Sequence, residues 1–66
     1  MNKKEQRKAL HRAYWTIKDV VEVREEYYED KSEQWQEGNQ GESYQSITES
    51  IDSVAESIRE TAVELQ

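Results

Sequence analysis

The sequence predicts an all-α protein, an antiparallel two-helix hairpin that self-associates into a four-helix bundle. The chain of 66 residues contains no proline, and both of its glycines, Gly38 and Gly41, lie near its middle. On either side of these glycines, apolar residues recur at the three- and four-residue steps of an α-helix. We therefore expect a single domain spanning residues 1–66, with a helix over about 3–30, a turn region over about 31–40 and a helix over about 41–65.

The first helix carries a wider apolar surface than one neighbouring helix covers. Its apolar residues form two rows, the first comprising Leu10, Tyr14, Ile17, Val21 and Tyr28 and the second comprising Ala13, Val20, Val23 and Tyr27. The partner helix within one hairpin covers a single stripe, so the second row needs another cover. A second copy of the chain is the simplest cover, and we expect a homodimer with the second row at the contact.

Arg24 interrupts the apolar line of Leu10 and Ile17, and two interpretations of it are open. In one, its aliphatic stem covers the edge of the core while the guanidinium reaches water. In the other, the guanidinium bridges to a carboxylate of a second copy. Arg24 is therefore counted with the candidate self-association residues of the second row.

The segment between the helices carries capping signals. Ser32 is expected to cap a short helical turn through Trp35, whose ring would cover that end of the bundle. Gly38 suits the left-handed conformation that closes a helix. The alternative is a first helix that runs unbroken to Gln36, which would shift the pairing register by about two turns.

The second helix has its own start signal and a heptad seam. Asn39, three residues before Glu42, has the spacing of an N-cap with a reciprocal capping carboxylate. Gly41 then lies in the first turn, where it lowers helix propensity. Beyond it a seam runs along one side of the helix, with Thr61 in the one polar slot: Tyr44, Ile47, Ile51, Val54, Ile58 and Leu65.

Small residues flank this seam and would allow another helix to approach closely. They are Ser43, Ser50 and Ser57 on one side and Thr48, Ala55 and Ala62 on the other. If the turn spans about residues 31–40, the expected facing pairs are Tyr28 with Tyr44, Val21 with Ile51, Tyr14 with Ile58, and Leu10 with Ala62.

The stretch EYYEDKSEQWQEGNQGESYQ, followed by ITESIDSVAESI, holds turn residues in a characteristic order: Asp30, Ser32, Glu33, Gln36, Gly38, Gly41 and Glu42. In this order the chain resembles a family of small helical-hairpin proteins from phages and prophages, over about residues 21–58. It departs from the family pattern at Lys31, where Asn is usual, at Asn39, where Glu is common, and in lacking a proline at the break. The resemblance implies a hairpin fold and a phage origin, with the host cytoplasm as the location, and it implies no catalytic residues.

The composition argues against several kinds of chemistry. The chain contains no cysteine and a single histidine, His11, so it lacks a thiolate nucleophile and the usual nitrogen and sulfur ligands of a metal site. Gly38 and Gly41 are not followed by the Lys and Ser or Thr of a phosphate-binding loop. We expect no enzymatic activity, no cofactor and no metal. Because no apolar run approaches the roughly 20 residues of a membrane helix, we expect a cytoplasmic protein without membrane contact.

Charge is distributed unevenly along the chain. Residues 1–18 hold six basic residues and one acidic residue, a net charge of +5, whereas residues 19–66 hold three basic and 14 acidic residues, a net charge of −11. The basic start and acidic end of the first helix oppose the helix macrodipole. We expect a group outside the isolated helix to compensate this arrangement.

Three interpretations of the charges are open. In the first, the hairpin brings the basic start of the first helix next to Glu60, Glu64 and the C-terminal carboxylate, and an antiparallel dimer extends the pairing. In the second, a basic face with an embedded aromatic ring binds nucleic acid or a nucleotide through Lys4, Lys8, His11, Trp15 and Lys18. For Trp15, a subunit contact is the alternative.

In the third interpretation, an acidic row imitates a phosphate backbone and inhibits a host nucleic-acid-binding or defence protein. The row consists of Glu22, Glu25, Glu26, Glu29 and Glu33, and Tyr27 and Tyr28 would serve as anchors. Taken with the second apolar row, these patterns predict a non-enzymatic interaction module that oligomerises and binds an unidentified macromolecular partner, a protein in preference to nucleic acid.

Overall fold

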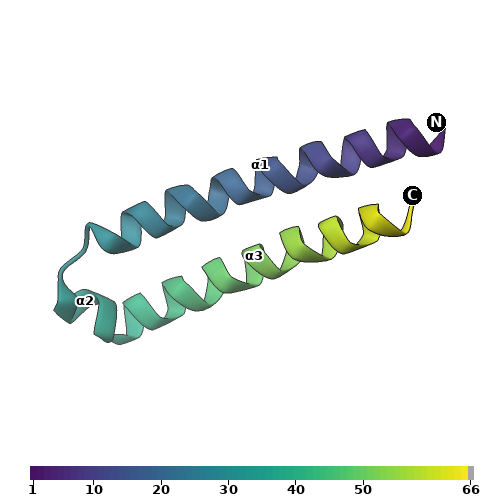
Figure 1. Ribbon diagram of the computed structural model, residues 1–66. Coiled ribbons are helices and arrows are strands. Elements are labelled where there is room, and N and C mark those ends of the chain that lie inside the picture. Colours follow the sequence, from purple (N-terminus) through teal and green to yellow (C-terminus); the bar gives the residue numbers. More distant parts are fainter. Residues whose placement is uncertain (66) are drawn as a thin grey trace.

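The computed structural model describes residues 1–65 as a helical hairpin (Figure 1). Its elements are α1 (Lys3–Glu29), α2 (Glu33–Glu37) and α3 (Asn39–Glu64). The long helices α1 and α3 lie side by side, with both chain termini at one end of a rod that measures 50 × 15 × 13 Å. The predicted all-α fold, with one long helix packed against another, is confirmed. The alternative of a first helix unbroken to Gln36 is wrong, because α1 ends at Glu29.

Both ends of α1 are capped by side chains. Asn2 Oδ1 accepts a hydrogen bond from the backbone N–H of Glu5 at 2.9 Å, which satisfies one of the free N–H groups of the first turn. At the other end, Gln36 reaches back from α2, and its Nε2 donates to the carbonyl oxygens of Tyr28 at 2.8 Å and Lys31 at 3.2 Å. Gln36 therefore binds one carbonyl in the last turn of α1 and one in the segment that follows it.

The short helix α2 confirms one capping prediction and corrects two. Ser32 Oγ accepts from the backbone N–H of Trp35 at 3.2 Å, as expected. The left-handed conformation expected at Gly38 is wrong, since its φ is −82° and its ψ is 178°. The N-cap expected at Asn39 is also wrong, because Asn39 is the first residue of α3 and Gly38 precedes it. Gly38 is both the C-cap of α2 and the N-cap of α3. Its backbone is extended because an N-cap residue adopts that conformation.

Gly41 is required by a close approach of two backbones. It is buried in the first turn of α3, directly under α2. A Cβ atom at this position would lie 2.6 Å from the Cα of Gln36 and even closer to the carbonyl oxygens of Trp35 and Gln36. The sequence predicted only a loss of helix propensity at Gly41, whereas the structure gives it a steric function.

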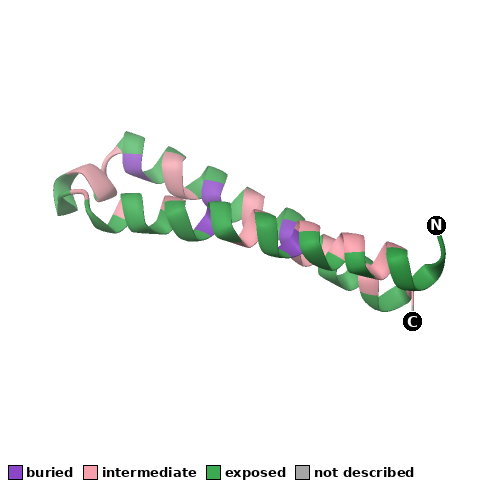
Figure 2. Ribbon diagram, turned by 90° about the horizontal axis from the view of Figure 1, so that it is seen from above, coloured by how far each residue is buried: buried purple, intermediate pink, exposed green. Residues whose placement is uncertain are grey.

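The core is a narrow stripe between α1 and α3, and the purple segments of Figure 2 mark it. Its buried side chains come from both helices: Tyr14, Val21, Thr48 and Ala55. Two residues of the expected seam, Ile47 and Val54, are not buried against α1. Their side chains are 54% and 53% exposed, so the seam is wrong at these positions within the hairpin. Instead, α3 turns its flank of small residues toward α1, because small side chains leave room for large ones opposite.

Two hydrogen bonds between the helices fix their register. Arg7 Nη1 donates to the carbonyl oxygen of Leu65 at 3.0 Å, and Arg24 Nε donates to Thr48 Oγ1 at 2.8 Å. These contacts lie at opposite ends of the rod and agree with the register expected from the sequence.

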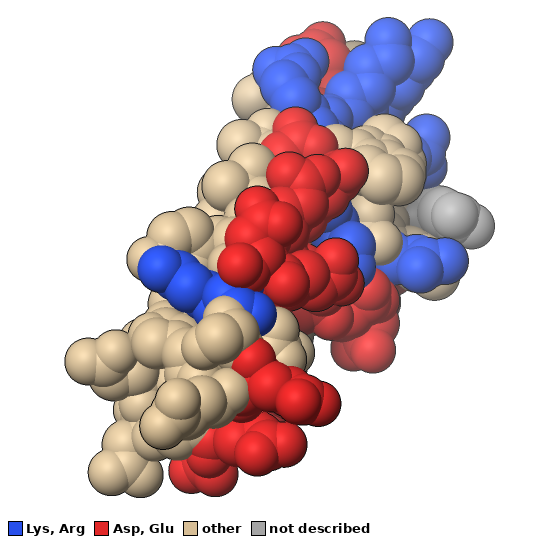
Figure 3. Space-filling model, turned by 90° about the vertical axis from the view of Figure 1, so that its left-hand side faces the viewer, with Lys and Arg blue, Asp and Glu red and all other residues tan. Residues whose placement is uncertain are grey.

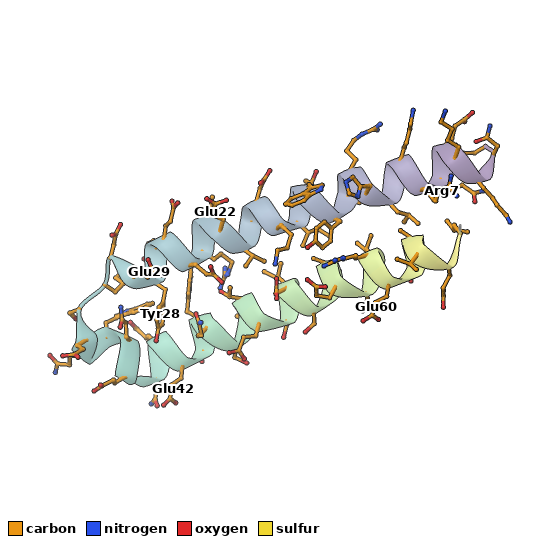
Figure 4. The ribbon with its side chains drawn as sticks, viewed as in Figure 1. Arg7, Glu22, Tyr28, Glu29, Glu42 and Glu60 are labelled. Atoms are coloured by element: carbon orange, nitrogen blue, oxygen red, sulfur yellow. The ribbon has the colours of Figure 1, made fainter. Side chains whose placement is uncertain are left out.

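Aromatic rings close the turn end of the hairpin. The Trp35 ring lies 6.1 Å from the ring of Tyr27, 6.0 Å from Tyr28 and 5.9 Å from Tyr44. Tyr27 stacks on Tyr44 at 5.2 Å, in the place expected for Tyr28, and the Tyr28 side chain points toward α3 (Figure 4). Trp35 thus covers this end, as the sequence predicted.

Candidate functional site

One flank of the hairpin is apolar and exposed. Its side chains on α1 are Val20, 46% exposed, Val23, 65% exposed, and Tyr27, 47% exposed, while the neighbouring Ala13 is half-buried. The two-row pattern of the first helix is therefore confirmed, since the hairpin covers the first row and leaves most of the second row in water.

The helix α3 continues this flank across the hairpin. Ile47 and Val54 are exposed, and Tyr27 and Ile47 line the same shallow hollow, so the apolar residues of both helices lie on one side. The serines at heptad spacing, Ser43, Ser50 and Ser57, border them and are exposed. We call this surface the uncharged face and define it by Val20, Val23, Tyr27, Ile47 and Val54 with these serines. Viewed from the turn end in Figure 3, the left-hand flank is largely tan, with few charged side chains.

Arg24 finds partners inside the hairpin. Besides Thr48, its guanidinium donates through Nη2 to the carbonyl oxygen of Tyr44 at 3.0 Å and lies 3.9 Å from the centre of the Tyr44 ring. The half-buried Arg24 lies beside the core, as the first interpretation expects, but the expectation that its guanidinium reaches water is wrong, because the guanidinium binds α3. Two of its nitrogens are thus used by α3, and the guanidinium stacks on an aromatic ring.

A groove lies at the open end of the hairpin, where the chain begins. Its volume is about 920 Å³. Half of its ten lining residues are basic, namely Lys4, Arg7, Lys8, Arg12 and Arg59, and no carboxylate among residues 1–65 lines it. The remaining lining comes from His11, Tyr14 and Trp15 of α1 and from Ala62 and Val63 of α3. We call this feature the basic groove.

Trp15 is held in a defined orientation beside the basic groove. Its side chain is 53% exposed, and its Nε1–H donates to Nε2 of His11 at 3.0 Å. The edge of the ring packs against Tyr14, with centroids 5.1 Å apart and an interplanar angle of 81°. These contacts fix the ring while leaving about half of it open to a ligand.

The structure brings together part of the basic face predicted from the sequence. Lys4, Lys8, His11 and Trp15 line the groove, but Lys18 does not. Its Nζ lies 2.6 Å from Oδ1 of Asp52 on α3, and this hydrogen bond raises the pKa of Lys18 above its ordinary value of 10.5. The prediction was wrong to include Lys18, because the pairing of the two helices supplies it with a carboxylate.

Sequence reasoning missed other residues of the groove. Arg12 lies one helical turn after Lys8, but the predicted stripe continued from Lys8 to His11 and left Arg12 out. Arg59 and Val63 come from α3, four residues apart, so only the antiparallel register places them next to the start of α1. Glu60 and Glu64, two of the groups expected to answer the basic start, form no ion pair with it. Within residues 1–65, the only ion pairs closer than 4.0 Å are Lys18 with Asp52 and Arg59 with Glu56.

The expected partners Glu60 and Glu64 are exposed, and Figure 4 shows Glu60 on the side of α3 that faces away from α1. The pairing of the basic start with these two carboxylates is therefore wrong for the single hairpin. The C-terminal carboxylate belongs to Gln66, which lies outside the described residues.

The predicted acidic row is exposed along α1 and α2. Its members Glu22, Glu25, Glu26, Glu29 and Glu33 all lie at the surface, and Figure 4 shows Glu22 and Glu29 along the turn half of α1. In Figure 3 acidic side chains form a band, with basic side chains gathered above it. The anchors expected for this row, Tyr27 and Tyr28, pack instead against Trp35.

Nowhere in residues 1–65 do three or more His, Asp or Glu side chains gather closely enough to hold a metal ion. Over the same residues, no helix combines the length and the apolar content needed to cross a bilayer.

Comparison with known proteins adds no relative. No family model matches the chain, and no curated protein or solved structure shows significant similarity to it. The resemblance to phage and prophage hairpin proteins stays a prediction.

Proposed function

We propose that the protein is a non-enzymatic interaction module whose hairpins dimerise through the uncharged face into a four-helix bundle. The observation that carries the proposal is the exposure of five apolar side chains on one flank that spans both helices: Val20, Val23, Tyr27, Ile47 and Val54. Exposed apolar surfaces of this extent commonly mark interaction sites in soluble proteins.

The uncharged face extends along part of the rod. Residues 13–27 of α1 and 43–57 of α3 each run for about 21 Å at 1.5 Å per residue, which is less than half of the 50 Å rod. The serines on α3 favour a second copy over a partner with long side chains, because small residues let helices approach closely. The same flank on α1 ends in Ala13, which is also small.

The thin core gives a further reason for self-association. Only three hydrophobic residues of the described chain are buried: Tyr14, Val21 and Ala55. A chain of this length buries a smaller share of its surface than a larger domain and has little stability to spare. Covering the uncharged face adds a second apolar stripe to the core, and hydrophobic burial is the main favourable contribution to folding.

Sedimentation equilibrium of the purified chain tests the proposal. The expected mass is that of a dimer at micromolar concentration. Replacing Val54 by Glu places a charge inside the interface and is expected to weaken dimerisation at least about tenfold, because an unpaired buried carboxylate is costly. The matched control is Ser53→Glu, which puts the same charge on the neighbouring exposed residue, about 100° away round the helix.

Circular dichroism on the same samples separates dissociation from unfolding. The proposal expects Ser53→Glu to remain dimeric and helical. A wild-type chain that is monomeric and fully helical at about 100 micromolar would contradict it, as would equal effects of the two substitutions.

The mimic interpretation receives less support. The acidic row is exposed, but the tyrosines that would anchor it belong to the aromatic cluster at the turn end. We also propose a phage origin, a location in the host cytoplasm and a further protein partner for the dimeric module. The test of dimerisation depends on none of these three.

A further inference from the structure

We propose that the basic groove binds a nucleotide, with the phosphates on its cationic side chains and the base stacked on Trp15. The groove gathers five basic side chains from both helices, and no carboxylate of residues 1–65 lines it. Four of them, Lys4, Arg7, Lys8 and Arg12, form no ion pair with any residue in that range. A bound polyphosphate supplies negative charge that the described part of the hairpin does not give these side chains.

The position of the cations adds to the need for an anion. Lys4 lies in the first turn of α1, where the positive end of the helix dipole disfavours further positive charge, and Arg7, Lys8 and Arg12 follow in the next two turns. Arg7 is further fixed by its hydrogen bond to the carbonyl oxygen of Leu65, so it presents a pre-oriented guanidinium at the groove. A charged group that is already oriented loses less conformational freedom when it binds a phosphate.

Trp15 supplies the selectivity for a base over a simple anion. Its ring is held by His11 on one edge and Tyr14 on another, and about half of its surface is open. Aromatic side chains beside basic ones are the usual platform for nucleotide bases, because every base has a face that stacks. The hydrogen bond requires an unprotonated Nε2 on His11, since the indole N–H can only donate.

The ligand is short. Along α1 the free cations span residues 4–12, about 12 Å at 1.5 Å per residue. Directly after the paired Lys18, the same side of α1 carries exposed carboxylates, beginning with Asp19 and continuing with Glu22. A long strand would run onto these acids, whereas a mononucleotide or the end of a single strand fits within the groove. The groove volume of about 920 Å³ lies within the common range for small-ligand sites.

This site is independent of the proposed dimer. Trp15 lies about 140° round α1 from Val20 and about 120° from Tyr27, so a second copy on the uncharged face leaves the groove open. Loss of one property is therefore distinguishable from loss of the other. Substitutions in the groove are expected to leave the sedimentation behaviour unchanged, and Val54→Glu is expected to leave nucleotide binding unchanged.

Isothermal titration calorimetry at about 50 mM salt tests the proposal with four probes: ATP, inorganic tripolyphosphate, adenosine and a single-stranded 12-mer of deoxyadenosine. ATP is expected to bind at least about tenfold more tightly than tripolyphosphate, adenosine is expected not to bind, and affinity is expected to fall as salt rises. If the 12-mer binds no more tightly than ATP, the natural ligand is a free nucleotide. If the 12-mer binds more tightly, the natural ligand is the end of a single strand.

Three variants give the controls. Trp15→Ala is expected to weaken ATP binding about tenfold while leaving tripolyphosphate unaffected. Lys8→Glu combined with Arg12→Glu is expected to abolish binding of both. Lys31→Glu makes the same kind of charge change at the turn end, far from the groove, and is expected to change neither affinity.

Three results would overturn the proposal. One is the absence of ATP and oligonucleotide binding by the wild-type chain. Another is equal affinity for ATP and tripolyphosphate that is insensitive to Trp15→Ala, which identifies a non-specific anion site. The third combines two observations: the wild-type chain binds no nucleotide, and the Lys8→Glu, Arg12→Glu variant has a different oligomeric mass. Together they would show that the groove binds the acidic row of a second copy.

Discussion

The two ends of the hairpin are built differently. At the turn end, Trp35 packs against three tyrosine rings, and Gln36 ties α2 to the end of α1 with two hydrogen bonds. At the open end, the hydrogen bond from Arg7 to the carbonyl oxygen of Leu65 is the one that joins α1 to α3. Val63, on α3 near that end, is 57% exposed.

This difference separates stability from binding. The turn end uses its polar and aromatic groups on one another, so few of them remain for a ligand. The open end leaves four cations and half of an indole ring available. Binding sites are commonly drawn from the less stable parts of a fold, and here the end with fewer contacts between its elements also holds the cations that form no ion pair within residues 1–65.

The largest effect is expected from Gly41→Val at the turn end. The added side chain collides with the backbone of Trp35 and Gln36, so α2 must leave its place on α3. We expect a loss of at least about 2 kcal/mol in the free energy of unfolding, as for an overpacked core. Urea denaturation followed by circular dichroism measures it.

Gly38→Ala is the control for this substitution. Its φ of −82° suits any residue, and its Cβ would meet the nearest backbone oxygen, of Gln34, at 3.3 Å. We expect a much smaller change in stability. Similar losses at the two positions would show that glycine flexibility, and not the close approach of α2 and α3, decides the stability of the turn end.

A smaller effect is expected from Arg24→Lys, which removes the planar fork but keeps the charge. Lysine cannot at once donate to Thr48 and to the Tyr44 carbonyl and stack on the Tyr44 ring. We expect a loss of about 1–2 kcal/mol in the free energy of unfolding. The same change at the exposed Arg12 is the control and is expected to cost almost nothing. If both substitutions cost equally little, the contacts of Arg24 do not stabilise the hairpin.

The sequence predicted the hairpin, its register, the Ser32 cap and the cover that Trp35 gives the turn end. Each of these depends on local signals, because helical periodicity, capping residues and turn length act over a few neighbouring residues. The excess apolar surface of α1 was also visible, since two rows on one helix exceed what one neighbour covers.

The sequence did not predict which stripe of α3 faces α1. Two adjacent stripes both have heptad spacing, one through Ile47 and Val54 and one through Thr48 and Ala55. Hydrophobicity favours the first, but the volume of Tyr14 and Val21 on α1 makes the small residues the better intramolecular fit. The choice depends on the partner helix, so no single helix pattern contains it.

Contacts between distant residues were missed for the same reason. Gly41 lies against α2 only because α2 folds back on α3, and Lys18 meets Asp52 only in the final register. The basic groove likewise takes Arg59 from the far end of the chain. Residue spacing along one helix identified Lys4, Lys8 and Trp15, but it could not predict which residues of α3 line the groove.

The smallest effect is expected from the ion pair of Lys18 and Asp52, which lies between the two ends. The hydrogen bond to Asp52 raises the pKa of Lys18 above 10.5, with side chains that are 31% and 40% exposed. A raised lysine pKa stabilises the folded chain fully below 10.5, and this contribution is lost as the pH rises through the pKa of the folded state. The difference in the free energy of unfolding between the wild type and Asp52→Asn should therefore be constant between about pH 8 and 10 and shrink above it, whereas the difference for the exposed Glu49→Gln should stay flat. A wild-type advantage over Asp52→Asn that persists undiminished well above pH 11 would show that Asp52 acts through packing and not through the lysine charge.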